Sequence, residues 1–259
     1  MSKALLVVSF GTTYAETRKK TIEALEGALA AAFPERKAYR AWTSSIIRKK
    51  LLRTEGMQID SVEEAMERML SDGVTDLLIQ PTHMMIGEEY YKALEGIKTY
   101  QNQFSRLAMG TPLLTSEEDL LRMARVLEKS FPQVKENEML ALMGHGSAVA
   151  EPNPYAIIDR ALASDGYSRF RIGTVEFEPG FEPLLEAAKV TRPEKIWLAP
   201  FMVVAGDHAC NDMAGAEEDS WASRFKAAGF ETACLLRGLG EYPAVRDMYV
   251  SHAREAAVL

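Results

Sequence analysis

The chain contains little cysteine and carries no excess of positive charge. Its 259 residues include only Cys210 and Cys234, which form no CxxC pair. Two isolated cysteines exclude a disulfide framework and a cysteine-rich metal site, and they fit a reducing cytoplasm. The formal net charge of −7 argues against nucleic acid as a partner, although it leaves room for a local basic pocket that binds an anion.

Long hydrophobic runs and nucleotide-binding motifs are also missing. No stretch has the apolar length of a transmembrane helix, and the first residues lack the cleavage site of a signal peptide. We therefore expect a cytoplasmic protein with no membrane partner. The segment SFGTT at 9–13 lacks the lysine and the spacing of a P-loop, and GxGxxG is absent, so no nucleotide cofactor is predicted. GHGS at 144–147 does not fit the GxSxG motif of a hydrolase.

What is present is a regular alternation of strand and helix patterns. The run 5–10 is almost continuously apolar, as in a parallel strand buried on both faces, and 15–32 has helical spacing. Asp60 or Ser61, and Ser116, are suited to cap helices. The alternation predicts an α/β fold with parallel sheets and right-handed crossovers. Further strands are predicted at 36–42, 75–80, 107–109, 139–143, 170–175, 196–204 and 232–236, and further helices at 46–52, 62–70, 88–100, 116–131, 155–163, 181–190, 212–228 and 244–257.

A short internal repeat relates the two halves of the chain. It predicts two similar α/β domains, at 1–115 and 116–259, with the metal site in the second. Whether the last helix packs back on the first domain is left open. The matched pairs are LLVVSFGTT at 5–13 with LALMGHGSA at 140–148, and LIQPTHMMIGEE at 78–89 with WLAPFMVVAGDH at 197–208.

Polar residues that follow predicted strands are the candidates for chemistry, because ligands bind at the carboxyl ends of strands in open α/β sheets. His145 lies between two glycines, and His208 follows a Gly-Asp pair at the end of an apolar run. Imidazole is a ligand for cobalt, nickel, iron or zinc. Taken alone, His145 favours a hydrogen-bonding loop residue over a metal ligand. His208 is consistent with a bystander at a helix start that Asp207, Asn211 or Asp212 caps.

One carboxylate candidate, Glu176, follows the strand predicted at 170–175. It is suited to be a general base or a metal ligand. Glu178 and Glu182 follow closely, so a solvated acidic loop is an alternative interpretation. In an extended segment Glu176 and Glu178 would point the same way, and the pattern does not decide between them.

Two other histidines and one turn complete the candidates. His83 is interpreted as ligand-facing, whereas Met84 and Met85 beside it are assigned to the core. His252, among charged residues of the last helix, is expected to be solvated. The Ser9–Thr13 turn precedes a predicted helix, and its backbone amides are suited to bind a carboxylate or a phosphate.

The motifs LLVVSFGTT, MGHGS and FMVVAGDHACNDM together resemble the cobalt chelatases of the anaerobic cobalamin pathway. These are the sirohydrochlorin cobaltochelatases of the class II chelatase family. The resemblance continues through PTHMMIGEEY, DSWASRF and GLGEYPAVRDMYVSH, and AGDHACNDM is its most specific part. It implies two Rossmann-like domains with a cleft between them. The implied activity is ATP-independent insertion of Co²⁺, as substrate metal, into sirohydrochlorin or precorrin-2.

The same resemblance implies the residues of the site. The family's metal-binding His, Glu and His fall on His145, Glu176 and His208, and His145 and Glu176 are the expected catalytic proton acceptors. Two alternatives remain open: an iron or nickel chelatase on the same scaffold, and a non-catalytic two-lobed protein that binds an anion or metal. Homo-oligomerisation is also left open. The expected contacts of the tetrapyrrole are Ser9, Phe10, Gly11, Thr12, Thr13, His83 and Gly206.

Overall fold

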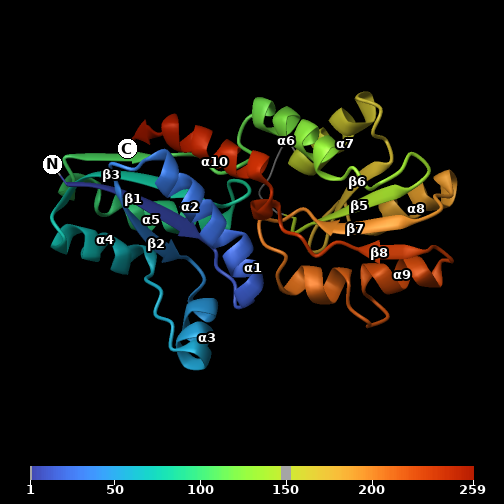
Figure 1. Cartoon of the computed structure of the whole chain (residues 1–259), viewed down its shortest axis with the longest axis horizontal. Helices are drawn as coiled ribbons and strands as arrows, with labels where there is room; N and C mark the ends of the chain where they lie inside the picture. The colour runs from blue at the N-terminus through green and yellow to red at the C-terminus, as the bar shows by residue number, and fades with distance from the viewer. Residues whose placement is uncertain (1, 147–152) are drawn as a thin grey trace. The chain divides into compact units, whose positions relative to one another are not determined.

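The structure is a computed structural model that describes residues 2–146 and 153–259 (Figure 1). Ser147 and Ala148, which end the second repeat motif, lie outside the described residues. The chain divides into two compact units, Met1–Thr115 with Pro243–Leu259, and Ser116–Tyr242.

The first unit is built around a five-stranded sheet of order β2-β1-β3-β4-β9. Neighbouring strands are parallel, as predicted, except that β9 pairs antiparallel with β4. The sequence pattern did not predict β9, which has only two residues. The elements are β1 (Ser2–Ser9), α1 (Ala15–Lys20), α2 (Ile22–Ala32), β2 (Lys37–Trp42), α3 (Ser45–Glu55), α4 (Val62–Ser71), β3 (Val74–Pro81), α5 (Glu88–Lys98), η1 (Gln101–Gln103), β4 (Arg106–Met109), α10 (Pro243–Arg254) and β9 (Ala257–Val258).

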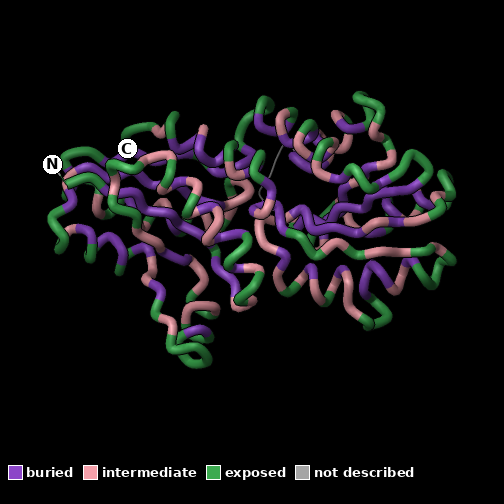
Figure 2. Tube along the Cα trace, viewed as in Figure 1, coloured by how far each residue is buried: buried purple, intermediate pink, exposed green. Residues whose placement is uncertain are grey.

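Strand β1 is buried on both faces, as its continuous apolar run predicts. Leu6 and Val8 belong to a core cluster that includes residues of α4 and α5. Leu5 and Val7 belong to a second cluster that includes residues of α2 and α10. Helices therefore cover both sides of the sheet, and Figure 2 shows its central strands as buried trace.

The second unit has a four-stranded parallel sheet of order β6-β5-β7-β8. Met139, Ala141 and Met143 of β5 share a core cluster with α8 and α9. In Figure 1, α6 and α7 run along one side of this sheet and α9 along the other. The elements are α6 (Glu117–Ser130), β5 (Met139–Gly144), α7 (Pro154–Ser164), β6 (Phe170–Thr174), α8 (Glu182–Thr191), β7 (Ile196–Pro200), the π-helical turn η2 (Ala209–Met213), α9 (Trp221–Ala227), β8 (Thr232–Cys234) and η3 (Leu239–Glu241).

The internal repeat is confirmed in the topology of the two sheets. In each unit the first strand lies between the second and the third, and the fourth pairs with the third. The repeat motifs fall on equivalent strands, β1 with β5 and β3 with β7. Gly11 and Gly146, which the repeat aligns, both have a positive φ, of 106° and 94°. A turn with a glycine at positive φ therefore follows the first strand of each unit.

Two helix N-termini have the caps that the sequence predicts. Ser61 and Ser116 each form a capping box, with Glu64 and Asp119 respectively. Each serine side chain accepts a hydrogen bond from a backbone N–H that the first helical turn would otherwise leave unpaired.

The helix predicted at 244–257 ends at Arg254, and three other predicted elements differ more from the structure. The helix predicted at 15–32 is two helices that meet at Thr21, where φ is −114° and ψ is −76° and the hydroxyl donates to the Thr17 carbonyl oxygen at 2.6 Å. The strand predicted at 196–204 ends at Pro200. The helix predicted at 212–228 is interrupted near Gly215, and α9 begins only after Ser220, whose side chain caps it.

Within the part of the chain that the structure describes, none of the helices combines the length and apolar character needed to cross a membrane.

Candidate metal site

Three neighbouring strands of the second sheet carry the three proposed metal ligands at their carboxyl ends. His145 directly follows β5, and Glu176 follows β6, which lies next to β5. His208 follows β7, on the other side of β5, after a short loop. Parallel strands place their carboxyl ends at one edge of the sheet. The fold therefore brings together residues that are far apart in the sequence.

Backbone hydrogen bonds fix the turn that bears His145 against the loop that bears Glu176. The N–H of Val175 donates to the carbonyl of Gly144 at 3.0 Å, and the N–H of Glu176 donates to the carbonyl of His145 at 3.0 Å. These bonds join the two loops directly beyond the ends of β5 and β6. The two side chains consequently leave adjacent points of the backbone.

The glycines on either side of His145 are required by close packing. A Cβ on Gly146 would lie 2.9 Å from Cδ2 of Phe177, and one on Gly144 would lie 2.4 Å from Cε1 of Tyr155. The Tyr155 hydroxyl also accepts a hydrogen bond from the Gly146 N–H at 3.1 Å. Tyr155, which sequence reasoning missed, therefore supports the turn through both its ring and its hydroxyl.

His208 is held at the start of η2 by a carboxylate one helical turn away. Its Nδ1 lies 2.6 Å from Oδ2 of Asp212. The sequence suggested Asp212 as a helix cap, but it lies inside η2 and pairs with His208 instead. The four-residue spacing of the two was the available signal, because such side chains are neighbours on a helical turn.

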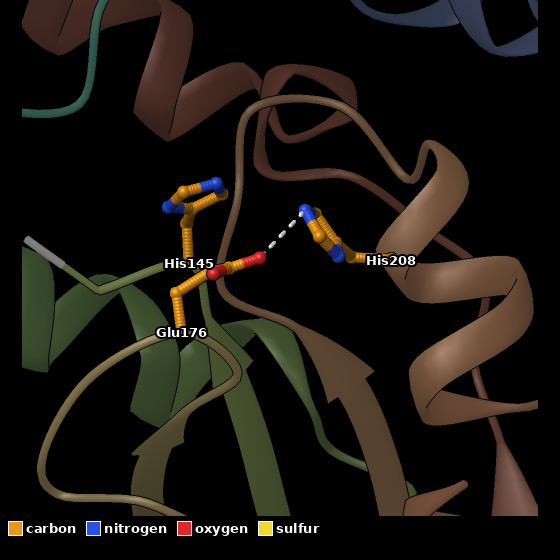
Figure 3. Close-up of side chains that lie close together, drawn as sticks. All are labelled: His145, Glu176 and His208. Carbon is orange, nitrogen blue, oxygen red and sulfur yellow. Dashed lines mark ion pairs between the residues drawn. The ribbon is translucent and has the colours of Figure 1, made fainter.

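The three side chains converge on one point (Figure 3). Each of His145, Glu176 and His208 offers one ligand atom, and these atoms lie within 4.8 Å of one another. Nε2 of His208 is 3.9 Å from Oε1 of Glu176, and the two imidazole rings are 5.1 Å apart between centroids. Ligands that share one ion at bonds of about 2.1 Å lie within roughly 4 Å of each other, so small side-chain rotations would close the group on a metal.

The site is open to solvent. His145 is exposed, and the side chains of Glu176 and His208 are 49% and 30% exposed to solvent. A large ligand can therefore reach the group from outside. Imidazole and carboxylate together form a donor set that suits first-row divalent ions.

The neighbouring carboxylates of Glu178 and Glu182 contact groups outside the metal site. The Glu178 carboxylate accepts a hydrogen bond from the Gly180 N–H at 2.9 Å, and Glu182 pairs with Arg224. The expectation that Glu176 and Glu178 point the same way is wrong, because the segment is a bend and not extended. The structure thus brings Glu176, and neither Glu178 nor Glu182, to the two histidines.

The Ser9–Thr13 turn lies at the carboxyl end of β1. Ser9 and Thr12 are buried and make internal hydrogen bonds, Ser9 from the Thr82 hydroxyl at 2.8 Å and Thr12 from the Tyr14 N–H at 3.2 Å. The parts of this turn that reach solvent are Phe10, 49% exposed, and the half-buried Thr13.

Gly11 and Gly206 are the two glycines among the expected tetrapyrrole contacts. Gly11 packs so closely on Trp42 that a Cβ would lie 2.6 Å from its ring. Gly206 lies two residues before His208 and is half-buried.

The first unit carries a different set of side chains at the positions equivalent to the metal site. The Ser44 N–H donates to the Phe10 carbonyl at 3.2 Å, which matches the bond from Glu176 to His145 in the second unit. Phe10 and Ser44 thus occupy the places of His145 and Glu176. Among the described residues, His145, Glu176 and His208 form the one cluster suited to a metal ion.

His83 follows β3 and is half-buried, but both of its ring nitrogens are shielded. Neither nitrogen has a hydrogen-bond partner among the described residues. Burial lowers the pKa of His83 from 6.5 to about 4, and the charge of Glu89 only partly opposes this. The imidazole is therefore neutral at pH 7. His252 was expected to be solvated, and this is wrong, because it is only 7% exposed.

Comparison with known proteins places the chain in a family. The family model described as "Cobalt chelatase (CbiK)" matches residues 3–258. A sirohydrochlorin cobaltochelatase of Salmonella typhimurium is 39% identical over 256 residues, covering 99% of this chain and 97% of that protein. A second one, the sirohydrochlorin cobaltochelatase CbiKC of Nitratidesulfovibrio vulgaris, is 28% identical over 257 residues, covering 98% and 90%.

Solved structures show the same fold at lower identity. The structure of SirB from Bacillus subtilis with Fe³⁺ has a TM-score of 0.67 at 16% identity, and the match covers 98% of this chain and 95% of that one. The match of nearly the whole sequence, together with the full-length relative above 30% identity, establishes the family. The chain belongs to the cobalt chelatase (CbiK) family.

Proposed function

We propose that this enzyme inserts Co²⁺ into sirohydrochlorin without ATP, as a step of cobalamin biosynthesis in the cytoplasm. The observation that carries the proposal is the convergence of His145, Glu176 and His208 in a chain of this family. The names of the relatives supply the substrate, because two of them are sirohydrochlorin cobaltochelatases.

In this proposal His145 and His208 hold the incoming Co²⁺, and Glu176 completes the site and offsets part of its charge. Neutral imidazole binds through one ring nitrogen. Nδ1 of His145 lies 3.2 Å from the Gly146 carbonyl oxygen, which favours the tautomer with the proton on Nδ1 and the lone pair on Nε2. That assignment leaves Nε2 of His145 to bind the metal.

Insertion releases two protons from the pyrrole nitrogens for each Co²⁺ that enters. A single lone pair cannot hold a metal and a proton together, so His145 accepts a proton only after Co²⁺ has moved to the macrocycle. Glu176 accepts the other proton. The exposure of both side chains lets these protons pass on to water.

The carboxylates of the tetrapyrrole need partners outside the metal site. We assign this role to the Ser9–Thr13 turn, through Thr13 and backbone amides, and to the backbone of Gly206. His83, which the sequence also suggested as a contact, keeps both ring nitrogens shielded, so it is not assigned a carboxylate. The exposed Phe10 ring offers an apolar surface for the macrocycle. The hydroxyls of Ser9 and Thr12 shape the turn from inside through their internal hydrogen bonds.

The test is anaerobic Co²⁺ insertion into sirohydrochlorin, followed by visible absorption. His145→Ala and His208→Ala should each lower turnover about 100-fold or more while the thermal transition is kept. Near-wild-type turnover by both variants would show that the site is wrongly assigned. Wild-type protein that binds sirohydrochlorin without inserting Co²⁺ would instead support the non-catalytic alternative.

A second candidate differs only in the metal. Imidazole and carboxylate suit iron and nickel as well as cobalt, and the similar SirB structure was solved with Fe³⁺. Initial rates of insertion of Co²⁺, Fe²⁺ and Ni²⁺ under identical anaerobic conditions distinguish the two candidate functions. A higher kcat/KM for Fe²⁺ or Ni²⁺ than for Co²⁺ would favour the second candidate.

A further inference from the structure

Asp212 makes a close polar contact with His208, although it is not one of the three converging side chains. Its Oδ2 lies 2.6 Å from Nδ1 of His208. We propose that Asp212 is a positioning residue that fixes the tautomer and the orientation of His208 and thereby strengthens its bond to Co²⁺. This inference rests on the proposed function and extends it to a residue behind the ligand.

The contact with Asp212 determines which ring nitrogen of His208 carries the lone pair that can bind a metal. A carboxylate only accepts hydrogen bonds, so the proton of neutral His208 resides on Nδ1. The lone pair is then on Nε2, the nitrogen that faces Oε1 of Glu176 at 3.9 Å. Figure 3 shows this side of the ring turned toward Glu176. The tautomer that Asp212 selects is thus the one that can share an ion with Glu176 and His145.

The backbone of η2 holds the carboxylate in place. The wide turn is closed by a hydrogen bond from the Ala214 N–H to the Ala209 carbonyl at 3.2 Å, and Ala209 and Met213 are buried in the core. Ala209 directly follows His208, and Met213 directly follows Asp212. Because π-helical turns are uncommon and concentrate at functional sites, η2 itself is an independent indication of a role here.

The charge of Asp212 adds to its effect on geometry. A carboxylate bonded to Nδ1–H makes the imidazole a stronger electron donor at Nε2. Glu176 and Asp212 together supply two negative charges, which offset those of a divalent ion. The metal is a substrate that must leave with the tetrapyrrole. Asp212 therefore acts on capture of Co²⁺, and its loss should raise the KM for Co²⁺ more than it lowers kcat.

Three variants test this. Asp212→Ala removes the acceptor, and Asp212→Asn keeps an oxygen acceptor but loses the charge. Asp207→Asn is the matched control, because Asp207 is an exposed carboxylate of the same segment whose Oδ1 accepts from the Asn211 side chain at 3.0 Å. Each protein is titrated anaerobically with Co²⁺ alone, by its visible absorption, and then assayed for insertion.

Asp212→Ala should bind Co²⁺ about 10- to 100-fold more weakly, with a matching rise in the KM for Co²⁺ and an unchanged KM for the tetrapyrrole. Asp212→Asn should recover part of the affinity, and Asp207→Asn should match the wild type within about twofold. All three should keep the wild-type thermal transition, because the Asp212 side chain is 46% exposed.

Two results would overturn the proposal. One is a Co²⁺ affinity of Asp212→Ala equal to that of the wild type. The other is an equal loss in Asp207→Asn, which would indicate a general electrostatic effect of the segment. The titration contains no tetrapyrrole, so it also distinguishes this inference from the proposed function. If the proposed function is wrong, the wild type binds Co²⁺ but does not insert it into the tetrapyrrole.

Discussion

The backbone N–H of Glu176 donates to the backbone carbonyl of His145, with 3.0 Å between the two heavy atoms. Two of the proposed ligands are therefore joined through the main chain, independently of any metal. The third, His208, is held separately by Asp212. A change in the turn after β5 should consequently disturb the relation of His145 to Glu176 without unfolding the sheet.

Gly146→Ala tests this relation. A side chain at φ 94° is strained, and its Cβ would lie 2.9 Å from the Phe177 ring, so the turn must shift. We expect a loss of about 1–3 kcal/mol in the free energy of unfolding, measured with urea, and a marked loss of Co²⁺ insertion.

Gly166→Ala is the matched control for that variant. Gly166 has φ 86°, but a Cβ added there would meet no atom within 4 Å, so the substitution introduces strain without a clash. It should lower stability by about 1–2 kcal/mol and leave insertion unchanged. Equal insertion rates for the Gly146 and Gly166 variants would contradict a special role of the turn after β5.

Glu176→Gln and Glu178→Gln compare two carboxylates that are two residues apart. Glutamine keeps the size of the side chain but neither accepts a proton nor offsets the metal charge. We expect Glu176→Gln to lower the insertion rate about 100-fold or more. Glu178→Gln should stay within about twofold of wild type, since its carboxylate bonds the Gly180 N–H. The reverse order of rates would assign the role to Glu178.

His83 should make stability depend on pH. Its pKa is about 4 in the folded chain against 6.5 when unperturbed, so the unfolded chain binds more protons between these values. Stability should therefore fall as the pH decreases from about 6.5 to 4. At pH 5 the loss relative to pH 7 is about 2 kcal/mol.

Urea midpoints of the wild type and of His83→Gln at pH 5 and pH 7 measure this contribution. The variant has no titrating group at this position, so the difference between the two proteins should shrink or reverse at pH 5. A constant difference across this range would show that His83 titrates normally and that its ring is hydrated.

Most of the fold was predictable because apolar periodicity reports burial directly. The run at 5–10 predicts a strand covered on both faces, and β1 is such a strand. The predictions failed where local backbone chemistry overrides periodicity. One predicted helix is divided at Thr21, whose hydroxyl bonds back to the preceding turn, and another is interrupted around Gly215. The two residues of β9 are too few to show any period.

The residues of the candidate site were also predictable only in part. The strand ends that carry His145 and His208 could be read from glycines after apolar runs. The choice of Glu176 over Glu178 could not, because it depends on a bend that turns one carboxylate back on its own loop. Asp212 could have been found from its spacing to His208, but the predicted helix placed it at an N-terminus.

The first unit is assembled from two distant parts of the chain, since α10 and β9 join it after the whole of the second unit. Val250 and Ala253 cover one face of the sheet, against Leu5 and Val7. During synthesis the ribosome delivers every residue of the second unit before these. The core of the first unit is therefore completed only after the second unit has been synthesised, and a nascent chain must keep β1 and β3 from aggregating until α10 emerges.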